Sequence, residues 1–264
     1  MFSVLRQEYQ SILASERFVD RRRLPPFGFK AYSQADEDGI LEELFRRIGT
    51  AGRYFVEFGC GNGLENNSHY LLLKDWQGLW IDGNEKHVEM IRRSFARPIK
   101  VGQLSVRSAF LTVDNIDRLL AETVRGEIDL LSVDVDGNDF HLLKSIKSIQ
   151  PRVIVVEYNA KKGRSLDWVM AYNPEHAWDG TDYYGASLKA FESILGQRGY
   201  SLVGCSISGV NAFFVRSDLV NEALFCPPFV SENHYEPHRR LLRLGMYSGF
   251  ASSYGDWTTA KESI

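Results

Sequence analysis

The sequence predicts an α/β protein with a Rossmann-like, seven-stranded, mostly parallel sheet that has helices on both faces and ends in an antiparallel hairpin. Between residues 53 and 158, short runs rich in β-branched, aromatic or leucine residues alternate with amphipathic helical stretches. This alternation is typical of βαβ units. The last two strand-like runs are separated only by residues 207–210, which are too few for a crossover helix. These two strands must therefore be antiparallel.

Each expected element follows from its composition and period. The five strands expected to be parallel, followed by the two hairpin strands, cover residues 54–58, 79–82, 99–105, 128–133, 152–157, 200–206 and 211–215. Amphipathic patterns predict helices over residues 65–74, 85–95, 115–122, 138–146 and 186–197.

The expected elements divide the chain into a core and flanking parts. We expect an N-terminal segment at residues 1–30, one domain at 31–216, and a tail at 217–264 that packs on this domain. A polar, aromatic insert at residues 160–185 follows the fifth strand, at the side where a substrate pocket would be covered.

The composition excludes several classes of protein. The 264 residues include 31 basic and 34 acidic side chains, a net charge of -3, which argues against a nucleic-acid partner. No apolar run is long enough to span a membrane, and Arg6 and Glu8 stand where a signal peptide would be apolar, so we expect a cytoplasmic protein. Three widely spaced cysteines indicate thiols. The oligomeric state is left open, a homo-oligomer included.

A glycine-rich loop follows the first expected strand. It reads Glu57-Phe58-Gly59-Cys60-Gly61-Asn62-Gly63, which has GxGxG spacing in place of the dinucleotide fingerprint GxGxxG. Glycines allow a tight turn and let the backbone approach a ligand. An acid beside the loop is poorly placed for a pyrophosphate and well placed for a cation, which favours S-adenosylmethionine.

Acidic residues stand at the ends of the expected strands. Asp82 follows Gly63 by nineteen positions, a separation that suits a carboxylate binding two ribose hydroxyls. The carboxyl ends of parallel strands share one edge of a sheet, so four such acids should converge and attract a cationic cofactor or a metal. These acids are Glu57, Asp82, Asp134 and Glu157.

The residues that follow the fourth and fifth strands leave several roles open. Oxygen atoms of Asp134, Glu157 and Asn159 are suitable ligands for a hard divalent ion such as Mg²⁺. They could equally contact the cofactor amine or the substrate, or support the turn itself. Because no spacing here is diagnostic of a metal, we favour contacts with cofactor and substrate, including Asp136 and Asn159 among the substrate contacts.

Several of these motifs resemble the FkbM-like methyltransferases of the seven-stranded S-adenosylmethionine-dependent superfamily. The resemblance covers about residues 30–216. It rests on YSQADED at 32–38, VEFGCGNG at 56–63, Asn66-Asn67-Ser68, SVDVDGND at 132–139 and RVIVVEYN at 152–159. Members of this family methylate oxygens on sugars, glycolipids and secondary metabolites.

The resemblance implies a set of cofactor contacts. Gly59 and Gly61 would approach the methionine moiety above Glu57, Asp82 would bind the ribose, and Ser108 and Ala109 would flank the adenine. Gln34 would lie over the cofactor and Asp134 near its amine, and we add Asn66 and Asn84 as further contacts. Metal-dependent O-methyltransferases offer a second comparison, from which this chain departs because Glu157 and Asn159 are not adjacent.

The expected reaction needs alignment of methyl donor and acceptor, and a hydroxyl acceptor also needs a base or a Lewis acid. The candidate catalytic residues are His141, His176 and Asp134. Aromatic residues in the insert suit sugar faces and hydroxyls, so Trp178, Tyr183 and Tyr184 are candidate substrate contacts.

The resulting functional prediction is an S-adenosylmethionine-dependent O-methyltransferase. Its acceptor would be a small molecule that carries a hydroxyl, either a sugar-containing compound, a glycolipid or another secondary metabolite. Two alternatives remain open at this point, an N-methyltransferase acting on a small amine and a catalytically inactive cofactor-binding scaffold.

Overall fold

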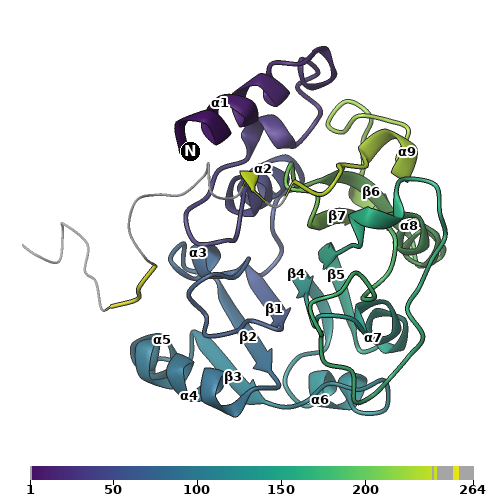
Figure 1. The fold of residues 1–264 in the computed structure, drawn as a ribbon. Coiled ribbons are helices and arrows are strands. Elements are labelled where there is room, and N and C mark those ends of the chain that lie inside the picture. Colours follow the sequence, from purple (N-terminus) through teal and green to yellow (C-terminus); the bar gives the residue numbers. More distant parts are fainter. Residues whose placement is uncertain (1, 240, 243–251, 256–264) are drawn as a thin grey trace, which may run out of the picture.

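A computed structural model describes residues 2–239, 241–242 and 252–255, which contain a seven-stranded sheet (Figure 1). The strand order is β3-β2-β1-β4-β5-β7-β6. The strands are β1 (Tyr54–Phe58), β2 (Gln77–Asp82), β3 (Leu104–Ser108), β4 (Gly126–Val133), β5 (Ile149–Glu157), β6 (Tyr200–Cys205) and β7 (Asn211–Arg216).

The strand order creates a crevice at one edge of the sheet. β1 pairs in parallel with both β2 and β4, so the chain builds outward in one direction to β3 and then in the other from β4. Ligands of open α/β sheets bind outside the carboxyl ends of the strands at such a reversal. β7 inserts antiparallel between β5 and β6, which confirms the expected terminal hairpin.

Helices cover both faces of the sheet, as the sequence predicts. In every strand except β3, residues on the two faces belong to two separate hydrophobic clusters, because side chains alternate between the faces of a strand. One cluster includes residues of α6 (Ile116–Ala121), α7 (Asp139–Ser145) and α8 (Leu188–Gln197). The other includes residues of α2 (Glu37–Ile48), α3 (His69–Leu72) and α4 (Glu85–Ser94).

The third strand lies later in the sequence than predicted. Residues 96–100 form the short helix α5 (Ala96–Lys100), and β3 begins at Leu104. The amide of Val101 donates to the carbonyl of Arg97 at 3.0 Å, and Pro98 lies in the first turn of α5, where its missing N–H costs nothing. The β-branched residues near position 100 thus misled the prediction, since strand propensity depends strongly on tertiary context.

The helix expected after the glycine loop, α3, is also shorter than predicted. The expected span was 65–74, but only His69–Leu72 is helical. Side-chain oxygens of Glu57 accept hydrogen bonds from the amides of Asn67 and Ser68, and Asn66 Oδ1 accepts one from the amide of His69. These amides therefore have partners outside a helix, and the chain after the glycine loop stays irregular.

The segments at the two ends of the chain lie against each other. α1 (Phe2–Leu13) precedes a loop in which Arg17 forms an ion pair of 2.8 Å with Glu236. The short helix α9 (Ser231–His234) and the residues after it run past β6 and β7 (Figure 1). Most of the expected tail beyond residue 242 lies outside the described residues, except for residues 252–255.

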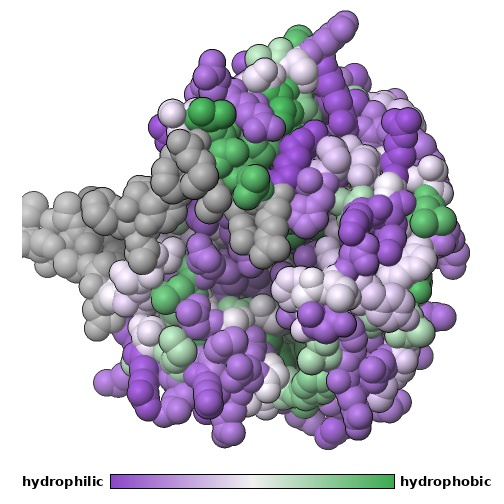
Figure 2. Space-filling model, in the orientation of Figure 1, coloured by the Kyte–Doolittle hydropathy of each residue, from purple (hydrophilic) through white to green (hydrophobic). Residues whose placement is uncertain are grey.

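The molecular surface in the view of Figure 2 is mostly hydrophilic, and hydrophobic side chains form separate small groups. Among the described residues, no helix combines the length and the apolar character needed to cross a membrane.

Candidate active site

The glycine loop turns sharply at the end of β1. Gly59, Gly61 and Gly63 have φ values of 68°, 56° and 79°, in the left-handed region that favours glycine. A Cβ at Gly59 would lie 1.6 Å from the carbonyl oxygen of Asp134, so only glycine fits against the end of β4. A Cβ at Gly61 would meet nothing within 4 Å, which leaves open space beside the loop at this position.

The carboxylate of Asp82 connects this loop to the end of β2. One oxygen accepts a hydrogen bond of 2.8 Å from the amide of Gly61, and the other accepts one of 2.8 Å from the amide of Asn84. Asn84 in turn caps α4, because its side chain accepts from the amide of Lys86. Asp82 and Asn84 therefore shape two adjacent loops at the expected cofactor edge.

The segment after β3 lies next to the end of β2. Ser108 is the register partner of Asp82, and the amide of Ala109 donates to the carbonyl of Asp82 at 3.0 Å. Phe110 follows and is 53% exposed, and a Cβ at Gly83 would lie 3.3 Å from its ring. The structure thus brings together the expected ribose residue and the expected adenine segment.

Glu57 is buried and its carboxylate is occupied by groups of the protein. Its oxygens accept hydrogen bonds from the amides of Asn67 and Ser68, and the hydroxyl of Ser68 donates to it at close range. Burial raises the pKa of Glu57. Its charge therefore needs no bound cation, and Glu57 supports the loop from below.

Asn66 lies in the irregular segment after the loop. Its Oδ1 accepts from the amide of His69 at 3.1 Å, while its buried Nδ2 has no hydrogen-bond partner among the described residues. A buried amide donor without an acceptor is costly unless a ligand supplies one. This atom is therefore a candidate contact for a cofactor oxygen.

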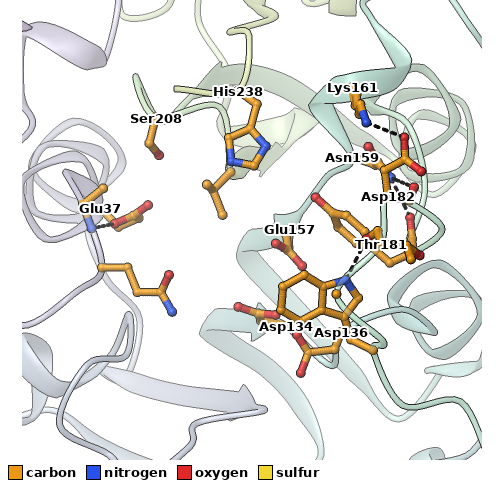
Figure 3. A pocket seen from close by; sticks show the side chains of 16 residues that line it. Glu37, Asp134, Asp136, Glu157, Asn159, Lys161, Thr181, Asp182, Ser208 and His238 are labelled. Atoms are coloured by element: carbon orange, nitrogen blue, oxygen red, sulfur yellow. Dashed lines mark hydrogen bonds and ion pairs between the residues drawn. The ribbon is translucent and has the colours of Figure 1, made fainter. Parts of the chain in front are cut away.

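A pocket of about 640 Å³ opens beside the ends of β4 and β5, as Figure 3 shows. This volume is in the range of small-molecule sites. The lining comes from five parts of the chain, the segment that leads into α2, the strand ends, the insert, the turn between β6 and β7, and the tail: Gln34, Ala35, Glu37, Asp134, Asp136, Glu157, Asn159, Lys161, Trp178, Gly180, Thr181, Asp182, Tyr184, Ser208, Val210 and His238.

Three carboxylates gather on one wall of this pocket. Asp134, Asp136 and Glu157 each offer an oxygen, and the three oxygens lie within 4.8 Å of one another. Burial raises the pKa of all three, and repulsion by neighbouring carboxylates, including that between Asp134 and Glu157, raises it further. Of the four acids expected to converge at this edge, the structure thus brings Asp134 and Glu157 together, with Asp136 as a third.

Asn159 and residues of the insert line the pocket on the same side as the acids (Figure 3). Asn159 is buried, and its Nδ2 donates to the carbonyls of Asp182 and Tyr184, each at 3.0 Å. The rings of Trp178 and Tyr184 meet edge to face at 6.4 Å, and both line the pocket. Tyr183 does not line it, since its ring packs edge to face against that of Trp168 at 5.8 Å and it is 52% exposed.

The two histidines expected to be catalytic, His141 and His176, lie at different distances from the pocket. His141 does not line the pocket, and its Nε2 lies 2.8 Å from the carbonyl of Met170. His176 lies closer to the acids, with Nε2 3.1 Å from the carbonyl of Asp136. His238, which sequence reasoning missed, lines the pocket itself, and its ring and Glu157 face the same cavity (Figure 3).

The loop before α2 brings Gln34 and Glu37 to the pocket. Asp36, Glu37 and Asp38 are all buried, and each binds a different partner. Asp36 accepts from the amide of Ile207, Glu37 from the side chain of Asn211, and Asp38 from three successive amides of residues 31–33. The signal in the sequence for this acidic segment is the YSQADED motif at residues 32–38.

The sheet order, the glycine loop and the crevice beside it define a Rossmann-like methyltransferase. The sequence matches the model of the methyltransferase FkbM domain over residues 42–202, which is more than half of the chain. The protein therefore belongs to the FkbM methyltransferase family, a class that uses S-adenosylmethionine as methyl donor, and the expected resemblance is confirmed.

Solved structures of methyltransferases are similar to this chain at low sequence identity. A putative caffeoyl-CoA O-methyltransferase from Staphylococcus aureus has 13% identity, a TM-score of 0.49, and coverage of 80% of this chain and 98% of that one. A putative O-methyltransferase from Klebsiella pneumoniae has 17% identity, a TM-score of 0.47, and coverage of 80% of this chain and 94% of that one. An O-methyltransferase from Bacillus cereus in complex with SAH has 16% identity, a TM-score of 0.44, and coverage of 80% of this chain and 89% of that one. The chain has no match among curated proteins.

Proposed function

We propose that this FkbM-family protein is an O-methyltransferase that transfers the methyl group of S-adenosylmethionine to a hydroxyl of a small acceptor. The acceptor class that we propose is a sugar-containing compound, a glycolipid or another secondary metabolite. The main support is the position of an acceptor-sized pocket beside the glycine loop, at the edge where the strand order reverses.

The residues of the loop fit the proposed cofactor. The space beside Gly61 and the unpartnered Nδ2 of Asn66 suit a ligand with a carboxylate, and Asp82 with Asn84 lies beside the segment Ser108–Ala109. In this proposal Gly59, Gly61 and Asn66 bind the methionine part, and Asp82, Asn84, Ser108 and Ala109 bind the nucleoside. Gln34 and Asp134 line the neighbouring pocket, which adjoins the proposed cofactor site.

The pocket would hold the acceptor so that its oxygen lines up with the methyl group and the sulfur. An O–CH₃ bond forms as the S–CH₃ bond breaks, the sulfonium becomes a neutral thioether, and the hydroxyl proton passes to a base. His238 and His176 are the histidines that we propose for this proton, because they border the acids of the pocket. Trp178 and Tyr184 would pack on apolar faces of the acceptor, while Asp136 and Asn159 would bind its hydroxyls.

N-methylation of a small amine is the second candidate. The observation in its favour is the cluster of Asp134, Asp136 and Glu157, which would attract a cationic amine into the pocket. An amine that enters as a cation must lose a proton before transfer, so both candidates require a base. They differ in the product, since one yields a methyl ether and the other a methylated nitrogen.

Calorimetry with S-adenosylmethionine tests the cofactor site. In Gly61→Asn we expect the affinity to fall at least about tenfold, because asparagine tolerates a left-handed backbone while its side chain enters the open space beside the loop. The matched control is Gly102→Asn, where φ is 76° and a Cβ also meets nothing, in the turn before β3 and away from the carboxyl edge of the sheet. Equal affinity in the two variants would contradict the proposed site.

Turnover with hydroxyl-bearing and amine-bearing acceptors, read by mass spectrometry, tests the reaction. A methylated oxygen supports the first candidate and a methylated nitrogen the second. Cofactor binding without turnover on any acceptor class would favour an inactive scaffold. In the active case we expect His238→Gln to lower kcat more than His141→Gln, since only His238 lines the pocket.

A further inference from the structure

The insert covers the pocket with a loop at residues 171–184, which supplies five of the residues that line it. The ends of the loop meet at an antiparallel bridge between Val169 and Ala186, and the amide of Met170 donates to the carbonyl of Gly185 at 2.9 Å. The structure describes this loop in full, and the loop contains no helix or strand. Its position over the pocket therefore depends on contacts with the rest of the protein.

The loop is buried on one side only. Among residues 171–183, Tyr172 and His176 are half-buried and the others are exposed. The ring of Tyr172 lies 5.4 Å from that of His141 in α7, and Nε2 of His176 lies 3.1 Å from the carbonyl oxygen of Asp136. The contacts that bury the loop thus come from the chain that follows β4.

His141, in the first turn of α7, holds the start of the loop. Its Nε2 lies 2.8 Å from the carbonyl oxygen of Met170, which is a buried residue. Because a carbonyl oxygen only accepts hydrogen bonds, Nε2 must carry the hydrogen and donate it. This nitrogen is therefore engaged with the loop and not available to take a proton from an acceptor.

Asn138, just before α7, holds the turn that follows. Its Nδ2 donates to the carbonyl of Asn173 at 2.8 Å, and its Oδ1 accepts from the amide of the same residue at 3.4 Å. The side chain of Asn173 accepts from the amide of Glu175, and its carbonyl accepts from the amide of His176. The side chain of Asn138 does not cap α7, so its hydrogen bonds serve the loop.

Gly137 makes room for the same turn. A Cβ at this position would lie 2.4 Å from Cδ2 and 2.6 Å from Nε2 of His176, so any other residue would displace the ring. Gly137, Asn138 and His141 together form a surface on which the loop rests, and we call these three residues the loop seat.

We propose that Asn138 and His141 are positioning residues for the acceptor, which act through the loop that they hold. The loop carries Trp178 and Tyr184, and the proposed function places both rings against the acceptor. A loosened seat would move these rings relative to the pocket and weaken acceptor binding. This inference deepens the proposed function, rests on it for the acceptor, and assigns His141 a role other than that of a base.

Two replacements of His141 separate a positioning role from that of a base. Glutamine keeps an N–H donor for the carbonyl of Met170, whereas phenylalanine keeps a ring and loses the donor. We expect His141→Gln to keep the acceptor KM and kcat within about twofold of wild type. His141→Phe should raise this KM about tenfold, the effect of one lost hydrogen bond, and leave the affinity for S-adenosylmethionine unchanged. An equal loss of kcat in both variants would indicate a base and overturn the proposal.

Hydrogen exchange read by mass spectrometry tests the loop seat without any reaction. In His141→Phe and in Asn138→Ala, we expect the amides of residues 170–176 to exchange about tenfold faster than in wild type. The amides of β4 should exchange as in wild type, which shows that the fold is retained. The control is Lys144→Ala, which changes an exposed side chain of α7 and should leave the exchange of the loop unchanged.

The outcomes separate this inference from the proposed function. Unchanged exchange of the loop in both variants would overturn the loop seat, whether or not the protein transfers methyl groups. Faster exchange with an unchanged acceptor KM would overturn the positioning role alone. Faster exchange in the variants, with no turnover of wild type on any acceptor, would support the loop seat and overturn the proposed transfer.

Discussion

Single residues at the candidate site owe their properties to burial. His69 is fully buried, and its ring lies 3.9 Å from that of Tyr32 and 5.1 Å from that of Phe95. Burial lowers the pKa of His69 to about 4, so the imidazole is neutral at pH 7. The sequence could not reveal this, because a histidine after a glycine loop can equally face a ligand.

Replacing this histidine should change how stability depends on pH. Between pH 6.5 and about pH 4, the imidazole of His69 binds a proton in the unfolded chain but stays neutral in the folded protein. The free energy of unfolding therefore falls as the pH falls through this range. The loss attributable to His69 should reach about 3 kcal/mol at pH 4, because the pKa is 6.5 in the unfolded chain and about 4 in the folded protein. His69→Phe keeps the ring contacts and should lack this loss.

Denaturant unfolding of wild type and His69→Phe at pH 7, 5.5 and 4 measures the difference. The other titrating groups are common to both proteins, so the change in their difference with pH isolates His69. Parallel curves over the whole range would contradict a buried, neutral imidazole.

At the scale of elements, short loops decide where the functional side chains lie. The loop before α2 is held by Asp38, whose Oδ2 accepts from the amides of Ala31, Tyr32 and Ser33 at 2.6–2.8 Å. The adjacent Asp36 and Glu37 connect the same loop to β7 and the turn before it. The hydrogen bonds of Asp36, Glu37 and Asp38 thus hold the loop so that Gln34 lies at the pocket.

Asp38→Ala should loosen this loop. Three amides lose their acceptor, so we expect a loss of about 1–3 kcal/mol in the free energy of unfolding, together with a higher KM for the acceptor. The control is Glu42→Ala on the same helix, which removes an exposed ion pair with Lys74 and should cost less than about 1 kcal/mol. If the two variants lose equal stability and keep the same KM, the loop does not depend on Asp38.

At the scale of the whole molecule, the two ends of the chain complete the site. Glu236 is buried and pairs with both Arg17 and Arg239 at 2.8 Å. The hydroxyl of Tyr158, just past β5, donates to the carbonyl of Glu236 at 2.6 Å. This packing fixes the segment that carries His238 over the hairpin of β6 and β7.

A double-mutant cycle of Arg17→Ala and Glu236→Gln tests this connection between the ends. Because one partner is buried, we expect a coupling energy of about 1–3 kcal/mol in unfolding experiments. The single variants should also lower turnover by displacing His238. Additive effects on stability would show that the two ends are held independently.

The sequence by itself determined the fold class, the glycine loop and the order of the elements, because each depends on local patterns. Alternation of strand and helix, the GxGxG spacing and the short 207–210 connection act over a few residues at a time. The structure confirmed the seven-stranded sheet. It corrected the third strand, because residues 96–100 form a helix, and the helix after the glycine loop, where the side chain of Glu57 accepts hydrogen bonds from the backbone.

Only the tertiary structure decided which acids share a site. Four strand-end carboxylates looked equivalent in the sequence, yet Glu57 is satisfied by backbone amides, Asp82 by two loops, and Asp134 and Glu157 face a pocket with Asp136. His238 joins them from about 80 residues farther along the chain than Glu157. The physical reason is that charge and burial depend on neighbours in space, and in this molecule those neighbours come from loops and tail segments whose paths no local pattern encodes.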